Sequence, residues 1–277
     1  MKTVRTLADL KRALEPFRPD ASIGFVPTMG AFHDGHVALF QAARRDCDVV
    51  VVSAFVNPAQ FGDPTDLATY PRDEAHDSQI ATAARVDVFF VPTVDEMYPV
   101  GYASWVDVEG PADGLENAAR PIHFRGVATI CLKLFAIVRP RLAFFGQKDA
   151  QQVAVIKQMV RDFNLDLDIR VVPTVRDADG LALSSRNARL SADDRARALA
   201  IPRALAAGVA AYQRGGDPAA AAHELLGGVE VDYVAVADFD RHPTLLIAVR
   251  VGTTRLIDNV RLQLAPNVDD AYHPERQ

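Results

Sequence analysis

Two histidines stand three residues apart in PTMGAFHDGH, residues 27–36, directly after the short apolar run SIGFV. The run predicts a buried strand, and the next residues predict a turn into a helix. Gly30 permits backbone conformations that other residues avoid, and Gly35 lets another group approach the main chain closely. His33 and His36 then lie at a helix N-terminus, where free N–H groups attract anions and imidazole N–H groups add directed hydrogen bonds. This arrangement suits a phosphate group.

Two other interpretations of this His-x-x-His pair stay open from these residues alone. Such a pair on a helix is commonly a surface feature or a hydrogen-bonded structural pair, so a short motif does not establish a phosphate site. A zinc site is less favoured, because no third ligand is evident nearby. The phosphate interpretation therefore depends on other segments that point to the same chemistry.

The segment NPAQFGD follows the β-branched run DVVVVSAFV, which is typical of a strand buried on both faces. Asn57 and Gln60 carry neutral amides, which both donate and accept hydrogen bonds and so suit the hydroxyl and carboxylate groups of a small substrate. An Asn-Pro turn accounts for Asn57 but does not account for Gln60.

The segment FFGQKDAQQ again ends a predicted strand and begins a helix. Lys148 offers a mobile cation, and Asp149 offers an acceptor, although an aspartate at this point can also be a helix cap. Gln152 lies three residues past Asp149, on the same helical face.

A fourth segment, DGLALSSRN, supplies two hydroxyls and a guanidinium from Ser184, Ser185 and Arg186. Arginine favours planar, bidentate contact with phosphate or carboxylate. Cationic, hydroxyl and amide groups from four segments form the set that ATP and a small polar acid require.

Strands and helices alternate over the first part of the chain, which predicts an α/β fold with a Rossmann-like parallel sheet. In such sheets ligands bind at the carboxyl ends of the strands. We expect one domain over residues 1–173 that binds nucleotide and small acid. A smaller α+β domain over 174–277 is expected to close over the substrates, and its polar end, 269–277, to be loosely held.

Composition sets further limits on function. The chain has 277 residues and a net charge of −6, so it lacks the basic balance typical of nucleic-acid-binding proteins, and no nucleic-acid partner is expected. The N-terminus has no signal-peptide pattern and no apolar run reaches the length of a membrane span, so we expect no membrane partner. With two widely separated cysteines, these features favour the cytoplasm.

These motifs resemble those of the pantothenate synthetase (pantoate–β-alanine ligase) family within the HIGH-type nucleotidyltransferases. The matching stretches include PTMGAFHDGH, FVNPAQFGD, YPRD, RPIHFRGVATICLKLF, FFGQKDAQQ, DGLALSSRN and GTTRLIDN, in order from about residue 22 to 259. The resemblance implies a homodimer that uses ATP with Mg²⁺ as an AMP-forming acid–amino-acid ligase. Pantoate attacks the α-phosphorus of ATP to give pantoyl adenylate and pyrophosphate, and the amine of β-alanine then releases AMP and pantothenate.

The resemblance also implies residue roles. It assigns catalysis to His36, the family's proton donor, and to His33, Lys148 and Arg186. It assigns ATP binding to Met29, Gly30, Ala31, Phe32, His33, Asp34, Gly35, His36, Gly146, Gln147, Lys148, Asp149, Val175, Leu183, Ser184, Ser185 and Arg186. It assigns pantoate and β-alanine binding to Gln60 and pantoate binding to Gln152, and it makes Asp77 a weak candidate for a magnesium ligand.

Two positions depart from the family pattern: Ile122 stands where glycine is common, and Ala150 where an aromatic residue is usual. Neither removes a polar group from the expected site. Two alternatives remain. A HIGH-type nucleotidyltransferase could act on a different small acceptor, although neutral amides at Gln60 and Gln152 suit pantoate better than a phosphorylated acceptor. The loss of one of the candidate His, Lys or Arg residues would favour a non-catalytic nucleotide-binding module. This sequence has all of them.

Overall fold

The computed structural model describes residues 1–18, 20–239 and 241–263, and it divides into two compact units, Met1–Ala188 and Arg189–Gln277. Residues 174–188, which we expected in the second domain, group with the first unit. The expectation of a loosely held end at 269–277 concerns residues outside the described part.

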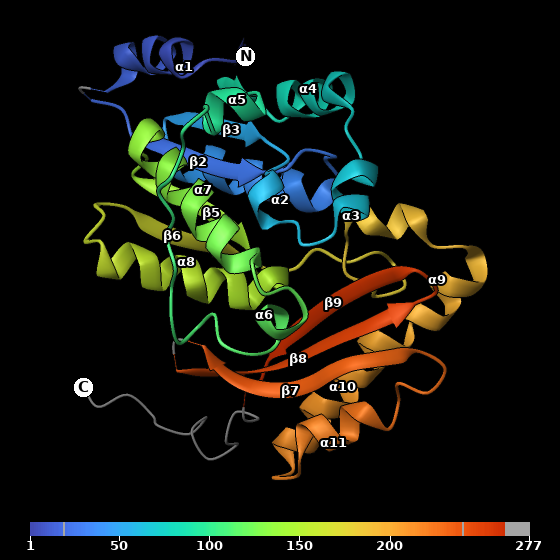
Figure 1. The fold of residues 1–277 in the computed structure, drawn as a ribbon. Helices are drawn as coiled ribbons and strands as arrows, with labels where there is room; N and C mark the ends of the chain where they lie inside the picture. Colours follow the sequence, from blue (N-terminus) through green and yellow to red (C-terminus); the bar gives the residue numbers. More distant parts are fainter. Residues whose placement is uncertain (19, 240, 264–277) are drawn as a thin grey trace, which may run out of the picture. The chain divides into compact units, whose positions relative to one another are not determined.

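The first unit alternates strands and helices as the sequence predicts (Figure 1). Its strands are β1 (Lys2–Val4), β2 (Ile23–Thr28), β3 (Val49–Ala54), β4 (Val88–Phe90), β5 (Leu142–Gly146) and β6 (Asp168–Val172). Its α-helices are α1 (Leu7–Leu14), α2 (Asp34–Asp46), α3 (Pro64–Thr69), α4 (Glu74–Ala83), α5 (Val94–Met97), α6 (Glu116–Ala119), α7 (His123–Val138) and α8 (Ala150–Asp162). Short 3₁₀ turns are η1 (Glu15–Phe17), η2 (Pro58–Gln60), η3 (Gln147–Asp149) and η4 (Ser185–Arg189).

The six strands form one parallel sheet in the order β1-β4-β3-β2-β5-β6. The predicted α/β class with a Rossmann-like parallel sheet is confirmed. Because β3, β2 and β5 are neighbours and run in one direction, the segments after them leave the same edge of the sheet.

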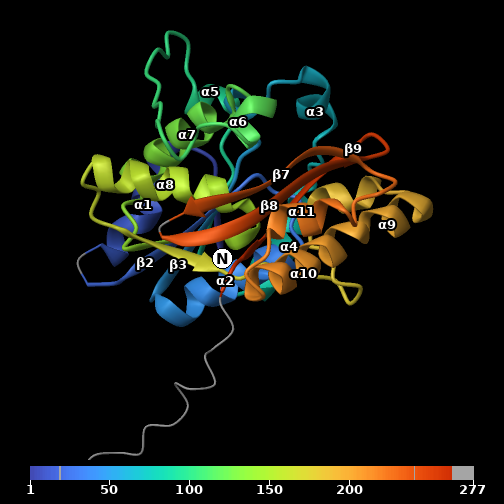
Figure 2. The ribbon, with the colours of Figure 1, turned by 90° about the horizontal axis from the view of Figure 1, so that it is seen from below.

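Helices cover both faces of this sheet (Figure 2), which explains why β3 begins with four consecutive buried valines. Alternate side chains along each strand enter two separate hydrophobic clusters. Phe25 and Val51 join the cluster that contains residues of α1, α7 and α8. Val50 and Phe89 join the cluster that contains residues of α2 and α4. The two clusters hold the central strands, and therefore the loops that follow them, in fixed positions.

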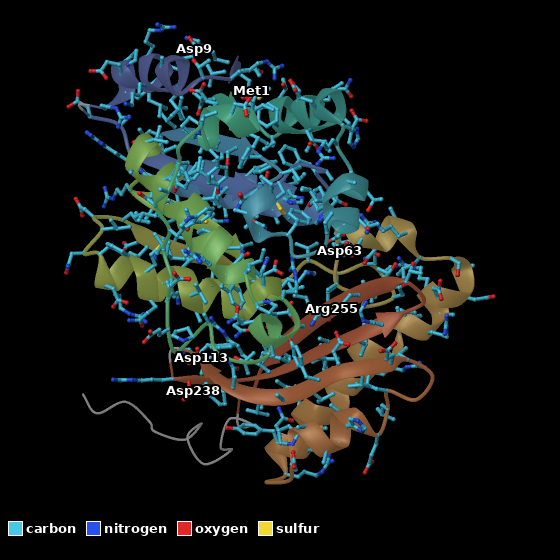
Figure 3. The ribbon with its side chains drawn as sticks, viewed as in Figure 1. Met1, Asp9, Asp63, Asp113, Asp238 and Arg255 are labelled. Carbon is cyan, nitrogen blue, oxygen red and sulfur yellow. The ribbon has the colours of Figure 1, made fainter. Side chains whose placement is uncertain are left out.

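The second unit is α+β, as predicted. Its helices are α9 (Ala192–Ala198), α10 (Ala200–Gln213) and α11 (Pro218–His223), and its antiparallel sheet consists of β7 (Glu230–Phe239), β8 (His242–Val251) and β9 (Thr254–Arg261) in that order. The central strand β8 is the most buried, whereas β7 alternates. Arg255, which Figure 3 labels, lies on β9. Its Nε donates to Oδ2 of Asp232 on β7 at 2.6 Å.

Two helix boundaries differ from the sequence prediction. The Ala- and Arg-rich stretch 191–213 predicts one helix, but the structure divides it at Leu199, which ends α9 and begins α10. Pro202 explains the break, because it has no N–H to donate to the carbonyl of Ala198 and so cannot continue the earlier helix. The sequence also predicts a helix from Gly126 to Val138, and that helix begins at His123 instead.

Among the described residues, no helix combines the length and the apolar character that crossing a membrane requires.

Candidate functional site

In the loop between β2 and α2, both histidine rings accept hydrogen bonds from backbone amides. His33 is the N-cap of α2, and its Nδ1 accepts a hydrogen bond from the Gly35 amide at 3.1 Å. The His33 amide in turn donates to Nδ1 of His36 at 3.3 Å. Because an amide N–H can only donate, both Nδ1 atoms are acceptors, and the protons of the neutral rings lie on the Nε2 atoms. The two rings, with centroids 4.2 Å apart, therefore each carry one N–H donor that the capping pattern leaves unused.

Both histidines are neutral in their surroundings. Burial, together with the neighbouring His33 and Lys148, lowers the pKa of His36 to about 3. Burial and Lys148 also lower the pKa of His33, while Asp34, Asp149 and other carboxylates oppose the shift. The rings can thus donate hydrogen bonds to an anion at pH 7, but positive charge must come from other groups.

The other residues of this loop, Met29–Phe32 and Asp34, contribute backbone turns and side-chain packing. Gly30 has φ +81° and Ala31 has φ +55°, so the chain turns through two consecutive left-handed residues, as expected for Gly30 but not for Ala31. The Phe32 ring is buried and lies 5.3 Å from the His36 ring. Met29 follows β2 directly, and Asp34 is an exposed residue in the first turn of α2.

Asp77, on α4, is buried against the same loop. Its Oδ2 accepts from the Ala31 amide at 2.9 Å, and its Oδ1 accepts from the Phe32 amide at 2.7 Å. Burial raises the pKa of Asp77, and the two amides oppose that rise. Within the described residues, no group of three or more His, Cys, Asp or Glu side chains has a geometry that could hold a metal ion.

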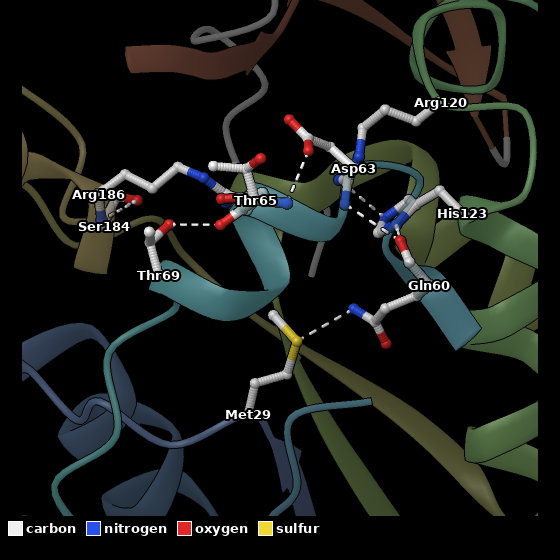
Figure 4. Close-up of polar contacts among 10 residues, drawn as sticks. Met29, Gln60, Asp63, Thr65, Thr69, Arg120, His123, Ser184 and Arg186 are labelled. Atoms are coloured by element: carbon white, nitrogen blue, oxygen red, sulfur yellow. Dashed lines mark hydrogen bonds and ion pairs between the residues drawn. The ribbon is translucent and has the colours of Figure 1, made fainter. Parts of the chain in front are cut away.

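Gln60 ends the η2 turn after β3 and is buried. Its Oε1 accepts from Asn57 Nδ2 at 3.0 Å, and its Nε2 lies 3.2 Å from the sulfur of Met29 (Figure 4). Asn57 is fixed by two further bonds, to the Gly126 carbonyl at 3.1 Å and from the Tyr98 hydroxyl at 2.8 Å. The amide of Gln60 is therefore held in one orientation, and a thioether is a weak acceptor that a substrate oxygen can replace.

Arg120 and His123 also reach Gln60, which the sequence reasoning missed. Arg120 Nη2 donates to the Gln60 carbonyl at 3.3 Å, and His123 Nδ1 lies 3.1 Å from the same oxygen (Figure 4). Burial lowers the pKa of His123 to about 4, with Arg120 adding to the shift. Their polar side chains at the start of an apolar helix, in RPIHF, were the available signal. Ile122, the departure in that motif, is exposed.

The segment after β5 contributes a cation and an acceptor. Lys148 Nζ lies 3.6 Å from Asp149 Oδ1, and its charge acts on both histidines. The next residue, Ala150, is buried. On α8, Gln151 binds backbone carbonyls of residues 111–114, a loop that Asp113 marks in Figure 3. Gln152 is half-buried and, among the described residues, makes no hydrogen bond to the other predicted positions.

Residues 175–186 form a hairpin-like segment in the same unit. The Leu183 amide donates to the Val175 carbonyl at 3.0 Å, and a Cβ built on Gly35 would lie 3.9 Å from Leu183 Cβ. This segment therefore runs beside the start of α2. Ser184 Oγ accepts from the Arg186 amide at 3.2 Å, which fixes the turn into η4.

Arg186 also meets α3. Its Nη2 donates to Asp66 Oδ2 at 3.0 Å, and each side chain is about a quarter exposed (Figure 4). Burial raises the pKa of Tyr70, while a hydrogen bond with Ser185 and the charge of Arg186 oppose the rise. Asp66 and Tyr70 thus contact or couple to Arg186 and Ser185, which no sequence pattern revealed.

Asp149 connects these groups electrostatically. Its charge acts on the pKa values of His33, Tyr70 and His123. The charge of Lys148 likewise acts on His33 and His36, so residues of the loops after β2 and β5 and the residues Tyr70 and His123 lie within electrostatic range of one another in the first unit.

Comparison with known proteins gives the same result over nearly the whole chain. A family model described as pantoate-beta-alanine ligase matches residues 2–261. The pantothenate synthetase of Moorella thermoacetica is 47% identical in an alignment of 281 residues that covers 95% of this chain and 99% of that protein. The pantothenate synthetase of Chloroflexus aurantiacus is 48% identical in an alignment of 280 residues that covers 95% of this chain and 99% of that protein.

Solved structures agree with this. The pantothenate synthetase of Thermus thermophilus superposes with a TM-score of 0.89 at 44% identity, covering 94% of this chain and 99% of that one. The pantoate-beta-alanine ligase of Francisella tularensis, complexed with "Beta-gamma ATP" and β-alanine, superposes with a TM-score of 0.84 at 36% identity. The match covers 94% of this chain and 97% of that one. By family model, by identity and by fold, this chain belongs to the pantoate–β-alanine ligase family.

Proposed function

We propose that this chain condenses pantoate with β-alanine at the expense of ATP. The reaction passes through pantoyl adenylate and releases pyrophosphate, AMP and pantothenate. The observation that carries the proposal is the pair of neutral histidines whose Nε2–H groups lie at the start of α2 beside Lys148. Membership of the pantoate–β-alanine ligase family supports the choice of substrates.

The first step is adenylation. A carboxylate is a poor acylating agent, because its oxide is a poor leaving group, and its attack on a triphosphate brings two anions together. Lys148 and Arg186 lower that repulsion, and His33 and His36 donate hydrogen bonds to phosphate oxygens. Hydrogen bonds that strengthen as pyrophosphate departs stabilise the transition state more than the ground state. Gly146, Gln147, Val175, Leu183, Ser184 and Ser185 complete the proposed nucleotide site.

Pantoate binds beside the amide of Gln60. Its hydroxyl and carboxylate oxygens replace the Met29 sulfur as partner of Gln60 Nε2, and Gln152 offers a second amide. Asn57 contacts the side chain of Gln60, and the side chains of Arg120 and His123 contact its backbone carbonyl. Because Gln60 is already held in position, little conformational entropy is lost there when pantoate binds.

In the second step the amine of β-alanine attacks the acyl carbon of the adenylate, the bond to AMP breaks, and the ammonium proton leaves to solvent. The adenylate must be shielded from water until this attack occurs. We propose that the Ser184–Arg186 loop and the second unit move toward the nucleotide to provide that shield.

Magnesium enters this proposal with the nucleotide. The residues fit poorly as a protein cage for the ion, since both oxygens of Asp77 already accept from loop amides. Mg²⁺ commonly keeps several waters and binds through substrate phosphates. We therefore assign it no protein ligand here and no step.

We further propose that the enzyme works as a homodimer in the cytoplasm. Both cysteines, Cys47 and Cys131, are unpaired and buried, which suits a reducing compartment. Sedimentation at micromolar concentration tests the dimer, and a monomer mass would reject it.

The decisive experiment is to trap the intermediate. ATP and pantoate without β-alanine should give an enzyme-bound pantoyl adenylate and one equivalent of pyrophosphate, detected by mass spectrometry after rapid quenching. AMP should then appear only when β-alanine is added. Transfer to a phosphorylated acceptor without any requirement for pantoate would identify a different HIGH-type nucleotidyltransferase.

The role of His36 is tested by His36→Ala. Removal of one donor to the phosphates should lower kcat by about a hundredfold or more, while pantoate affinity stays near that of the wild type. Turnover close to the wild type would contradict this role.

A further inference from the structure

We propose that Asp77 is a positioning residue that holds the histidine loop in its anion-binding shape, rather than a metal ligand. This inference rests on the proposed function for its catalytic consequence. Its structural part stands on the contacts of the loop itself.

The carboxylate of Asp77 is committed to two consecutive amides of the loop. Oδ2 accepts from Ala31 at 2.9 Å and Oδ1 from Phe32 at 2.7 Å, and the side chain is 3% exposed. A carboxylate that accepts one hydrogen bond on each oxygen in a buried setting is well satisfied. It has no need of a cation to be stable there.

The backbone that Asp77 contacts adopts an unfavourable conformation, with positive φ angles at Gly30 and Ala31. Ala31 has φ +55°, which costs an L-residue free energy unless the surroundings compensate. Gly30, with φ +81°, approaches so closely that a Cβ would lie 2.8 Å from Oδ2 of Asp77. The absence of a side chain at Gly30 therefore makes room for the carboxylate itself.

The constraint passes directly to the histidines. Phe32, whose amide Asp77 binds, packs its ring against His36 and Phe40. The next residue, His33, begins α2 and donates its own amide to His36 Nδ1. Fixing the amides of residues 31 and 32 thus fixes where α2 begins, and with it the direction of both Nε2–H groups.

Binding a metal ion would require a different orientation and different neighbours for the Asp77 carboxylate. A ligand to Mg²⁺ needs a lone pair that faces the ion and companions that complete the set. Here the carboxylate faces backbone N–H groups, and the described residues supply no cluster of three ligands. Loop positioning and metal binding can therefore be separated by experiment.

The first measurement is hydrogen exchange of the ligand-free protein, which does not depend on any activity. In the wild type, the amides of residues 31 and 32 should exchange slowly for a loop. In Asp77→Asn one amide loses its acceptor, and exchange in residues 29–36 should rise by about tenfold, with residues 49–54 unchanged. Wild-type amides that exchange as fast as unprotected ones would overturn the proposal without any variant.

The second measurement is kinetic. Asp77→Asn should lower kcat/KM for ATP by about ten- to a hundredfold, Asp77→Ala by more, and KM for β-alanine should stay unchanged. The Mg²⁺ concentration for half-maximal rate should also stay unchanged. A raised Mg²⁺ requirement with wild-type exchange in the loop would instead make Asp77 a metal ligand and overturn the inference.

Asp87→Asn is the matched control. Asp87 also accepts a backbone amide, from Val50 at 2.7 Å, and binds Arg44, but it lies away from the loop. This variant should lower thermal stability without changing loop exchange or kcat/KM for ATP. If loop exchange responds to Asp77→Asn while the wild type makes no pantothenate, the proposed function fails and the positioning role stands.

Discussion

The two loop histidines show how a single residue type can serve two purposes at once. Each uses Nδ1 to close the start of α2 and keeps Nε2–H for another partner. Because burial keeps the rings neutral, they add hydrogen bonds without the charge repulsion that two adjacent imidazolium groups would suffer. Positive charge in the proposed site then comes from Lys148 and Arg186.

Neutral burial of histidine has a cost in acid. His36 and His123 have pKa values of about 3 and about 4 in the folded chain, against an ordinary 6.5. Below pH 6.5 the unfolded chain therefore binds protons that the folded chain does not, so stability falls as pH falls. Each such histidine should cost about 1.4 kcal/mol per pH unit in this range.

Thermal denaturation between pH 7 and pH 5 checks this expectation. The melting temperature should be flat above pH 7 and fall below about pH 6.5. His123→Gln keeps a donor toward the Gln60 carbonyl but does not titrate, so its curve should fall less steeply. A wild-type melting temperature that rises toward pH 5 would show that these rings are protonated in the folded chain.

At the scale of elements, the contact between α7 and η2 is unusually close. A Cβ on Gly126 would lie 2.4 Å from the carbonyl oxygen of Ala59, so only glycine lets the helix approach this turn. The approach brings the Gly126 carbonyl to Asn57 and places His123, one turn earlier, against the Gln60 carbonyl. The helix α7 thereby positions Gln60, which we assign to pantoate.

Gly126→Ala should therefore affect both stability and substrate affinity. The added methyl group should force η2 away from α7, lower stability by about 1–3 kcal/mol, and raise KM for pantoate more than KM for ATP. Gly227→Ala is the control, because a Cβ there meets nothing within 4 Å. Urea denaturation and steady-state kinetics measure the two effects, and equal changes in both KM values would argue against a local displacement.

At the scale of the whole molecule, the chain consists of two compact units with different architectures, a parallel α/β sheet and an antiparallel α+β sheet. The nucleotide residues that we propose, including Ser184–Arg186, all belong to the first unit. Ion pairing of Arg186 with Asp66 holds that loop to α3. A triphosphate competes with Asp66 for the same guanidinium.

We expect ATP with pantoate to compact the molecule and protect residues 184–189 from proteolysis. Small-angle X-ray scattering should give a smaller radius of gyration with both substrates than with neither. Asp66→Asn removes the competing carboxylate and should strengthen ATP binding by about two- to fivefold. Identical scattering and cleavage with and without substrates would reject closure.

The sequence by itself determined the fold class and indicated candidate residues for the site. Buried strands and amphipathic helices follow from side-chain periodicity, which depends on neighbours in the chain. Gly30, His33, His36, Gln60 and Lys148 could be singled out because each follows a recognisable strand, and parallel strands end at one edge.

Tertiary structure alone decided which groups meet from distant segments. Asp77 lies 45 residues from Phe32 and Arg186 lies 120 from Asp66, and no local pattern links either pair. The same holds for the neutral state of the histidines, because desolvation depends on everything that packs around a ring. Local periodicity fixes what a segment becomes, whereas burial and long-range contacts fix what its side chains can do.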